Sequence, residues 1–469
     1  MDIFGIAVLV VFVATYAAIS TERYNKTALS LLGMALVGFV FWAARFLIPG
    51  VEVDFLDLLE QIEWDTILFV AAMMIIVAVA GGSGMFQYLA LRLARPSGGV
   101  HKSLYTIFML FVFIISPVVD NVSILLIMAP LTVQVCRALE MDFKPLLISQ
   151  AMVAHLGSIP SLVGAVPNIV IVKETGLDAG LLFVVFMPLS FILFIINWVV
   201  LTRYFADSFV ASDKERVDIL FQIEPTTMIK SRSGFYASVI AFAVLIFGFL
   251  LSASLNFPVS MLALLIAASL LVFAHDRASE FLDEVGWDTI FFLVGIFALV
   301  GALNLTGWID LFGDGLGIII GDNAIIALTF MIWIPALIAS FLNNIPVSLV
   351  LAPIALRFTT VSPLLPFALI FAVNVAGNIL TPLGSTSNMV AIAYSEREHD
   401  PISFADFSKA GTIAGTCNLI LGTVWLLLIE YLGILLVTFG GLILGVILFQ
   451  IIIFPVLHNP SRVEPKRSS

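Results

Sequence analysis

Charged residues are scarce in this chain: aspartate, glutamate, lysine and arginine make up 11% of its 469 residues, against about 25% in ordinary soluble domains. Its two cysteines, Cys136 and Cys417, are too few for a disulfide framework or a metal cluster. It also lacks a P-loop, a His-Glu-x-x-His motif and clustered acids. These absences predict a protein that is not an enzyme, needs no cofactor and has no transition-metal site. Its net charge of −11 argues against nucleic acid as a partner.

Long apolar runs take the place of charge, since 61% of the residues are hydrophobic. A helix needs roughly 20 apolar residues to cross the hydrocarbon core of a bilayer. The chain is therefore expected to be an all-α, polytopic protein of the cell membrane with the lipid bilayer as its solvent. About eleven spans are expected, at 3–20, 28–48, 66–90, 103–135, 180–202, 236–253, 258–274, 289–305, 324–357, 410–431 and 433–457.

Two further apolar segments, about 146–172 and 365–394, are interrupted by Gly, Pro, Ser, Thr and Asn. Broken backbone at membrane depth is tolerated only where it lines a cavity or is buried in protein. We expect each segment to be a re-entrant hairpin.

Short basic loops set the orientation, because Lys and Arg are enriched on the cytoplasmic side. Arg23 and Lys26 follow the first span and Arg92 and Arg95 follow the third, whereas the loop after the second span is acidic. This alternation predicts an N-terminus outside, a cytoplasmic linker at 203–235 and a cytoplasmic tail at 458–469.

The two halves of the chain resemble each other. Trp64–Phe69 recurs as Trp287–Phe292, and Asp120 and Asn121 recur at the same offset as Asn343 and Asn344. Such matches at one spacing indicate an internal repeat. We expect repeat 1 at 1–202, repeat 2 at 236–432 and an additional span at 433–457. Five crossings plus one hairpin per repeat would invert the second copy, which is common in secondary transporters.

Asp120 is the strongest candidate for function, because an acid in an apolar span is costly unless it faces a cavity, titrates or binds a cation. Pro117 interrupts the helix just before it. A simpler explanation is that Asp120 caps the second half of a broken helix, and both roles are compatible. Asn121 adjoins it, and the second repeat has Asn343 and Asn344 at these positions.

The interrupted segments supply the other candidate ligands of a substrate or coupling ion. Glycines let backbone approach a ligand closely, and hydroxyls and carboxamides offer neutral oxygens suited to Na⁺. A packing seam of small residues is the alternative. The candidates are Ser158, Ser161 and Asn168 in the first copy, and Asn378, Thr381, Ser385, Thr386, Ser387 and Asn388 in the second.

His155 lies one turn before the first interruption, and Val375 takes its place in the copy. An imidazole could relay protons there, although a lone buried histidine is more often a satisfied hydrogen-bonding group.

In these motifs the sequence resembles the ion transporter superfamily, and within it the arsenite permeases, the sodium/proton antiporters and the melanosomal P protein. The resemblance rests on Val119–Val122, Met128–Pro130, Gly164–Asn168 and Thr381–Ser385 and extends over nearly the whole chain. It implies a scaffold with a transport domain, alternating access and a homodimer. One departure is Ala165, where many relatives have an acid.

Together these features predict a secondary active transporter for a small inorganic anion or an arsenite-like oxyanion, coupled to H⁺ or Na⁺. The alternatives are a Na⁺/H⁺ antiporter, a transporter of di- or tricarboxylates, and a passive anion channel.

Overall fold

A computed structural model describes residues 3–20, 24–47, 53–62, 64–94, 97, 100–209, 224–255, 258–341 and 344–458. These residues form helices joined by turns. Eight helical segments are long and apolar enough to cross a membrane: 26–47, 64–82, 179–204, 260–283, 287–305, 324–341, 404–432 and 434–458. The described residues therefore form an all-helical, multi-pass membrane protein, and the count of eleven spans stays a prediction.

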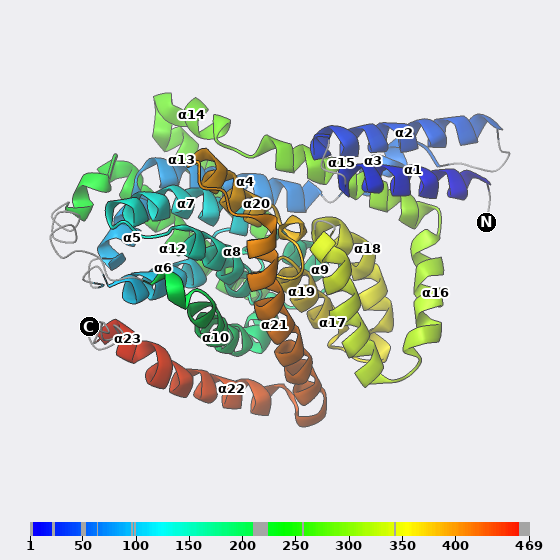
Figure 1. The fold of residues 1–469 in the computed structure, drawn as a ribbon. Helices are drawn as coiled ribbons and strands as arrows, with labels where there is room; N and C mark the ends of the chain where they lie inside the picture. Colours follow the sequence, from blue (N-terminus) through cyan, green and yellow to red (C-terminus); the bar gives the residue numbers. More distant parts are fainter. Residues whose placement is uncertain are drawn as a thin grey trace.

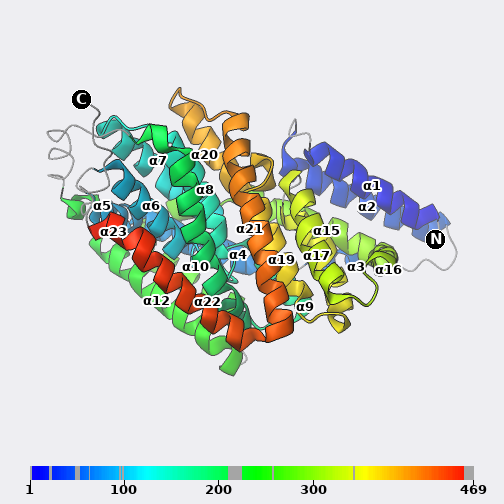
Figure 2. The same ribbon diagram turned by 60° about the horizontal axis from the view of Figure 1, so that its bottom comes forward.

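Each half of the chain begins with five helices at the periphery. Figures 1 and 2 show α1 and α2 at one end of the molecule and α5 and α12 at the other. The first set is α1 (Ile3–Ser20), α2 (Lys26–Leu47), α3 (Phe55–Glu60), α4 (Trp64–Gly82) and α5 (Met85–Ala94). The second set is α12 (Arg232–Leu255), α13 (Val259–Ala274), α14 (Ala278–Asp283), α15 (Trp287–Leu305) and α16 (Trp308–Ile320).

The peripheral helices of the two halves exchange partners, since α2 packs on α15 and α13 packs on α4. The equivalent helices α4 and α15 run antiparallel. Gln61, before the start of α4, accepts a hydrogen bond at 3.3 Å from Asn304 near the end of α15, whereas Met74 in α4 lies beside Gly286 before α15. These two corresponding helices thus point in opposite directions.

Five further helices follow in each half. In the first half they are α6 (His101–Ile115), α7 (Asn121–Ala138), α8 (Lys144–Ser158), α9 (Val166–Thr175) and α10 (Ala179–Tyr204). In the second half they are α17 (Ala324–Phe341), α18 (Asn344–Arg357), α19 (Leu365–Ala376), α20 (Thr386–Arg397) and α21 (Phe404–Leu432). Beyond them, α22 (Ile434–Leu448), a π-helical turn at 449–453 and α23 (Phe454–His458) form one continuous segment.

The chain reverses direction between α6 and α7, where the sequence predicted one span over 103–135. Tyr105 near the start of α6 hydrogen-bonds Ser149 at 2.6 Å, and Phe113 near its end lies against Gly157 near the end of α8, so α6 runs parallel to α8. Thr132 in the second half of α7 bonds Gln150 in the middle of α8, and Asn121 at the start of α7 lies beside His155 near the end of α8, so α7 runs antiparallel to α8. The pair α6–α7 is therefore a helical hairpin with its turn at 116–120.

The expected hairpin at about 146–172 is instead a discontinuous helix. Trp198 of α10 donates to Thr106 of α6, and Phe194 stacks on Phe113, so the end of α10 lies beside the starts of α6 and α8. Since α10 has 26 residues, its own start lies about 39 Å away along its axis. Only a short link joins the end of α9 to the start of α10. The chain reaches the start of α10 only if α8 and α9 together cross from one face of the molecule to the other.

The second half repeats this arrangement. Trp333 of α17 bonds Thr423 of α21, and Ser362 before α19 bonds Glu430 at the end of α21. Because α20 ends at Arg397, shortly before α21 begins at Phe404, α19 and α20 lead from one end of α21 to the other. The hairpin expected at about 365–394 is accordingly a discontinuous helix, and α17–α18 contains the reversal.

Residues 459–469 of the expected tail lie outside the described chain. The linker expected at 203–235 is described only in part, because residues 210–223 also lie outside it. It includes two short turns, η2 (Ala206–Ser208) and η3 (Pro225–Met228). The second turn packs on α5 beside Gly84, whose φ of 83° favours glycine. A Cβ at Gly84 would collide with the Met228 carbonyl oxygen, so this glycine permits the close approach of the linker.

Candidate functional site

The turn of the first hairpin is fixed by Asp120. Its carboxylate accepts hydrogen bonds from the backbone N–H groups of Val122 at 3.0 Å and Ser123 at 3.1 Å, which caps the start of α7. The capping role expected for Asp120 is thus present, and a transport role stays a prediction. Asn343, the equivalent residue of the second half, lies outside the described residues.

The first discontinuous helix is interrupted at residues 159–165, which we call the first break. The Asn168 carboxamide donates to the carbonyl oxygens of Ser158 at 2.9 Å and Ser161 at 2.7 Å. The Ser161 hydroxyl donates to the Pro117 carbonyl oxygen in the hairpin turn. The Ser158 and Ser161 carbonyls therefore find a donor in α9, and the Pro117 carbonyl of the hairpin turn finds a donor in the break.

The second discontinuous helix is interrupted at residues 377–385, the second break, with equivalent bonds. The Asn388 carboxamide donates to the carbonyl oxygens of Gly377 at 2.5 Å and Pro382 at 3.3 Å. The Thr381 hydroxyl donates to the Ser340 carbonyl oxygen near the end of α17. Asn168 and Asn388, and Ser161 and Thr381, thus perform the same structural task in the two halves.

The two breaks meet through two buried side chains. His155 of α8 places Nδ1 3.1 Å from the Asn121 carboxamide nitrogen and Nε2 3.2 Å from the Ser387 hydroxyl. On the other side, Asn374 of α19 donates to Asn168 Oδ1 at 2.6 Å and its Oδ1 accepts from Ser158 at 3.2 Å. All of these side chains are buried. His155 thus contacts α20 next to the second break, and Asn374 contacts residues on both sides of the first break.

Asn374 joins the candidate site in the structure, and the sequence prediction missed it. The equivalent position in the first half is Ala154, so the comparison of repeats did not select Asn374. The available signal was a carboxamide within the otherwise apolar Leu365–Ala376. A buried amide in such a helix requires partners, and it obtains them from the opposite half.

Lys26 was also missed as a site residue, because the sequence placed it in a cytoplasmic loop. It is the first residue of α2, and its ammonium group donates to the Thr386 hydroxyl at 3.2 Å. A cation therefore stands beside the second break.

Glycines bring the breaks against neighbouring backbone. A Cβ at Gly164 would collide with the Ser116 carbonyl oxygen, and one at Gly384 would lie 2.8 Å from the Ala339 carbonyl oxygen. A Cβ at Gly377 would lie 2.7 Å from His155 Nε2. These contacts leave no room for a larger residue where the breaks meet.

Three buried carboxamide oxygens, those of Asn121, Asn378 and Asn388, accept no hydrogen bond from the described residues. The Asn378 amide nitrogen donates to the Met152 carbonyl at 3.0 Å, which orients its side chain. Such oxygens can serve as neutral ligands of a cation. Within the described chain, no three His, Cys, Asp or Glu side chains gather in a way that could hold a metal ion.

The helix starts that follow the breaks carry partial positive charge. No side chain caps α9 at Ala165 or α20 at Ser385, in contrast to the start of α7. Ser385 and Ser387 instead bond each other at 2.9 Å, and the Asn344 carboxamide lies 3.4 Å from the Val373 carbonyl. The breaks thus combine polar neutral side chains with two uncapped helix starts.

An all-helical membrane fold whose central helices are interrupted and cross-linked by buried polar groups is typical of secondary transporters. Residues 16–373 match the family model described as CitMHS, citrate transporter. The chain therefore belongs to the citrate transporter family of the ion transporter superfamily. The predicted resemblance is confirmed, and membership in a transporter family supports a role other than an enzyme.

Several curated proteins are similar over most of the chain. A 46 kDa membrane protein of Mycobacterium leprae is 27% identical over 428 residues, covering 90% of this chain and 98% of that protein. An uncharacterized transporter of Mycobacterium tuberculosis is 29% identical over 431 residues, with the same coverage of 90% and 98%. The human P protein is 22% identical over 483 residues, covering 86% of this chain and 57% of the P protein.

Proposed function

We propose that the chain is a secondary active transporter that carries a small anion by alternating access and binds it where the two breaks meet. The observation that carries this proposal is the contact between the breaks, with His155 and Asn374 reaching across from opposite halves. The uncapped starts of α9 and α20 and the ammonium group of Lys26 favour an anion there.

Inverted repeats are the proposed basis of alternating access. The antiparallel course of the equivalent helices α4 and α15 supports this arrangement, as does the exchange of partners between α2, α13, α4 and α15. In a protein so built, rocking of one unit against the other exposes a central site to each side in turn.

Coupling to an ion has two candidates. Na⁺ would use the unpartnered carboxamide oxygens of Asn121, Asn378 and Asn388, because neutral oxygens on broken helices are typical ligands of coupling Na⁺. A proton would use Asp120, the half-buried acid at the start of α7. Asp120 lacks a titratable equivalent in the second half, so proton coupling would act through one repeat.

The proposed substrate is a small inorganic anion or oxyanion. A carboxylate is the second candidate, favoured by the description of the family as citrate transporters. Both bind through oxygens that accept from N–H, hydroxyl and ammonium donors, which the breaks supply.

Purified protein in liposomes tests these assignments. Na⁺ and pH gradients are imposed, and internal pH is recorded while arsenite, phosphate, sulfate, succinate or citrate is added singly. We expect proton or Na⁺ movement only with a transported anion. Proton movement evoked by Na⁺ without an anion would replace the proposal with Na⁺/H⁺ exchange, and anion flux without either gradient coupling would indicate a passive channel.

We also propose that the chain forms a homodimer in the cell membrane, with the N-terminus outside and the C-terminus in the cytoplasm. Helix α2 supports an apolar partner surface, since Phe46 and Leu47 are 74% and 78% exposed. Either lipid or a second subunit can cover such a surface, and chemical cross-linking of the protein in liposomes distinguishes the two.

A further inference from the structure

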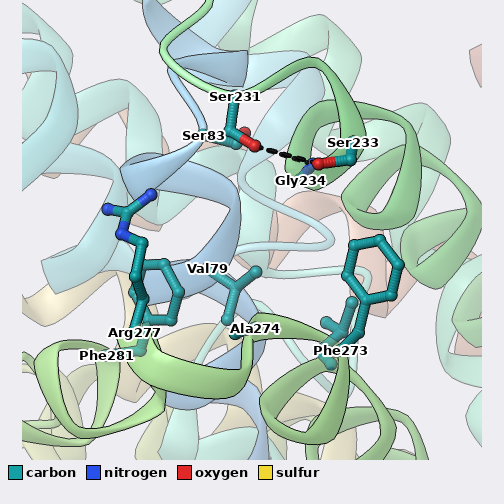
Figure 3. Close-up of a pocket in the computed structure, with 10 residues that line it drawn as sticks. Val79, Ser83, Ser231, Ser233, Gly234, Phe273, Ala274, Arg277 and Phe281 are labelled. Atoms are coloured by element: carbon teal, nitrogen blue, oxygen red, sulfur yellow. Dashed lines mark hydrogen bonds between the residues drawn. The ribbon is translucent and has the colours of Figure 1, made fainter.

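A cavity of about 200 Å³ lies away from the breaks, between the ends of α4 and α13, the start of α12 and the segment that begins α14 (Figure 3). Its walls come from both halves of the chain. Ser83 closes α4, Ser231 and Ser233 lie at the start of α12, and Arg277 follows α13. The backbone N–H of Lys230 donates to the Ser83 carbonyl at 3.0 Å, and this bond joins the linker to the edge of the cavity.

The polar side of the cavity is built to donate hydrogen bonds. Arg277 uses Nε to bond Glu280 at 2.9 Å and stacks over the Phe281 ring at 5.0 Å. Its two terminal nitrogens have no hydrogen-bond partner among the described residues. Ser231 and Ser233 place their hydroxyls 3.2 Å apart, and Figure 3 shows them and the guanidinium around the same cavity.

The other side of the cavity is apolar and open to the periphery. Val79, Leu270 and Phe273 line it, and Phe273 is 58% exposed. Val272 beside it is 81% exposed, so the apolar surface continues outward from the cavity. A ligand that satisfies both sides has an anionic, hydrogen-bond-accepting group attached to a hydrocarbon chain.

Cations and acids both lie near the cavity. Lys230 and Arg232 belong to the same short segment as Ser231, Glu280 occupies the Nε edge of Arg277, and Glu284 interacts electrostatically with Lys230 and Arg277. By the basic-loop pattern, the ends of α4 and α13 and the start of α12 face the cytoplasm, where anionic lipids are enriched and basic pockets between membrane helices bind their headgroups.

We propose that this cavity binds the phosphate group of an anionic membrane lipid, with an acyl chain along Val79, Leu270 and Phe273. Arg277 pairs with the phosphate through its terminal nitrogens, since a guanidinium matches two phosphate oxygens, and a serine hydroxyl donates to a third. The bound lipid touches α4 of the first half and α12 to α14 of the second, so it stabilises their contact.

The test measures the melting temperature of the purified full-length protein in a neutral detergent as phosphatidylglycerol or phosphatidylcholine is titrated in. Phosphatidylglycerol should raise the melting temperature of the wild type more than phosphatidylcholine does. In Arg277→Gln the apparent affinity for phosphatidylglycerol should fall about tenfold, because a charge-assisted pair is lost.

Arg45→Gln is the matched control, because Arg45 is a comparably exposed arginine that pairs with Asp54 far from the cavity. It should respond to phosphatidylglycerol as the wild type does. Arg277→Lys, which keeps the charge, should retain part of the response even if Arg277→Gln folds poorly. An equal response of wild type and Arg277→Gln, or equal stabilisation by inorganic phosphate alone, would overturn the lipid site.

Discussion

At the residue scale, the interactions between the breaks assign distinct tasks to chemically similar side chains. Asn168 and Asn388 hold the carbonyls of their own breaks, whereas Asn374 reaches across to the other half. A carboxamide can do either because it both donates and accepts. Its position on the helix, and not its type, decides which task it performs.

Asp120→Asn separates capping from coupling. Asparagine caps a helix about as well as aspartate, so the fold should be preserved within about 0.5 kcal/mol. Loss of the only titratable group at this turn should remove the pH dependence of transport while substrate exchange continues. Transport across a range of external pH measures this, and an unchanged pH profile would exclude proton coupling through Asp120.

His155→Val places in the first half the residue that the second half has at this position. It removes the imidazole contacts with Asn121 and Ser387, so the two breaks lose one of their links. We expect the transport rate to fall at least about tenfold, since two buried polar groups lose a partner. Rates are compared at equal protein level with His458→Val, a control at an exposed histidine of α23. Equal rates in both variants would contradict a site role.

At the scale of elements, the close fit of the linker on the α4–α5 turn depends on a glycine. Gly84 and Gly176 both have positive φ, but only Gly84 has a neighbouring carbonyl in the space of a Cβ. The two positions therefore share the cost of the left-handed backbone, about 1–2 kcal/mol, and differ in the steric collision. They form a matched pair.

Gly84→Ala should accordingly lower the melting temperature more than Gly176→Ala. The extra loss reflects displacement of η3 from α5, where the Met228 carbonyl lies. Thermal unfolding of both variants in detergent measures the difference. A larger effect of Gly176→Ala would mean that the linker contact contributes little to stability.

At the scale of the whole molecule, two ion pairs bring together loops from opposite halves. Arg137 pairs with Glu398, and Lys144 pairs with Asp400 at 2.7 Å. If the chain reverses within α6–α7 and within α17–α18, the segment between α7 and α8 and the segment after α20 lie on the same face of the membrane. If the chain reversed at 146–172 and at 365–394 instead, these two segments would lie on opposite faces of the membrane.

Cysteine labelling from each side of a sealed vesicle tests this topology, after Cys136 and Cys417 are replaced. Asp142→Cys and Asp400→Cys should react with an impermeant thiol reagent from the same side, and Asp178→Cys from the other. Reaction of the first two from opposite sides would restore the topology first expected from the sequence.

The sequence by itself determined the class of the protein, because apolar length, scarce charge and repeated motifs are properties of the chain. It also selected most of the residues at the two breaks, since equivalent polar residues recur at one spacing. Comparison of repeats could not find Asn374 or Lys26, whose partners come from distant segments.

Only the tertiary structure decided which interrupted segments reverse and which continue. Pro and Gly mark where helical hydrogen bonding fails, but the direction taken afterwards depends on the helices packed alongside. Tyr105 against Ser149 and Thr132 against Gln150 fix that direction for α6 and α7. Such contacts join residues from different helices. Local sequence therefore predicts where a helix is interrupted but not the direction that the chain takes after the interruption.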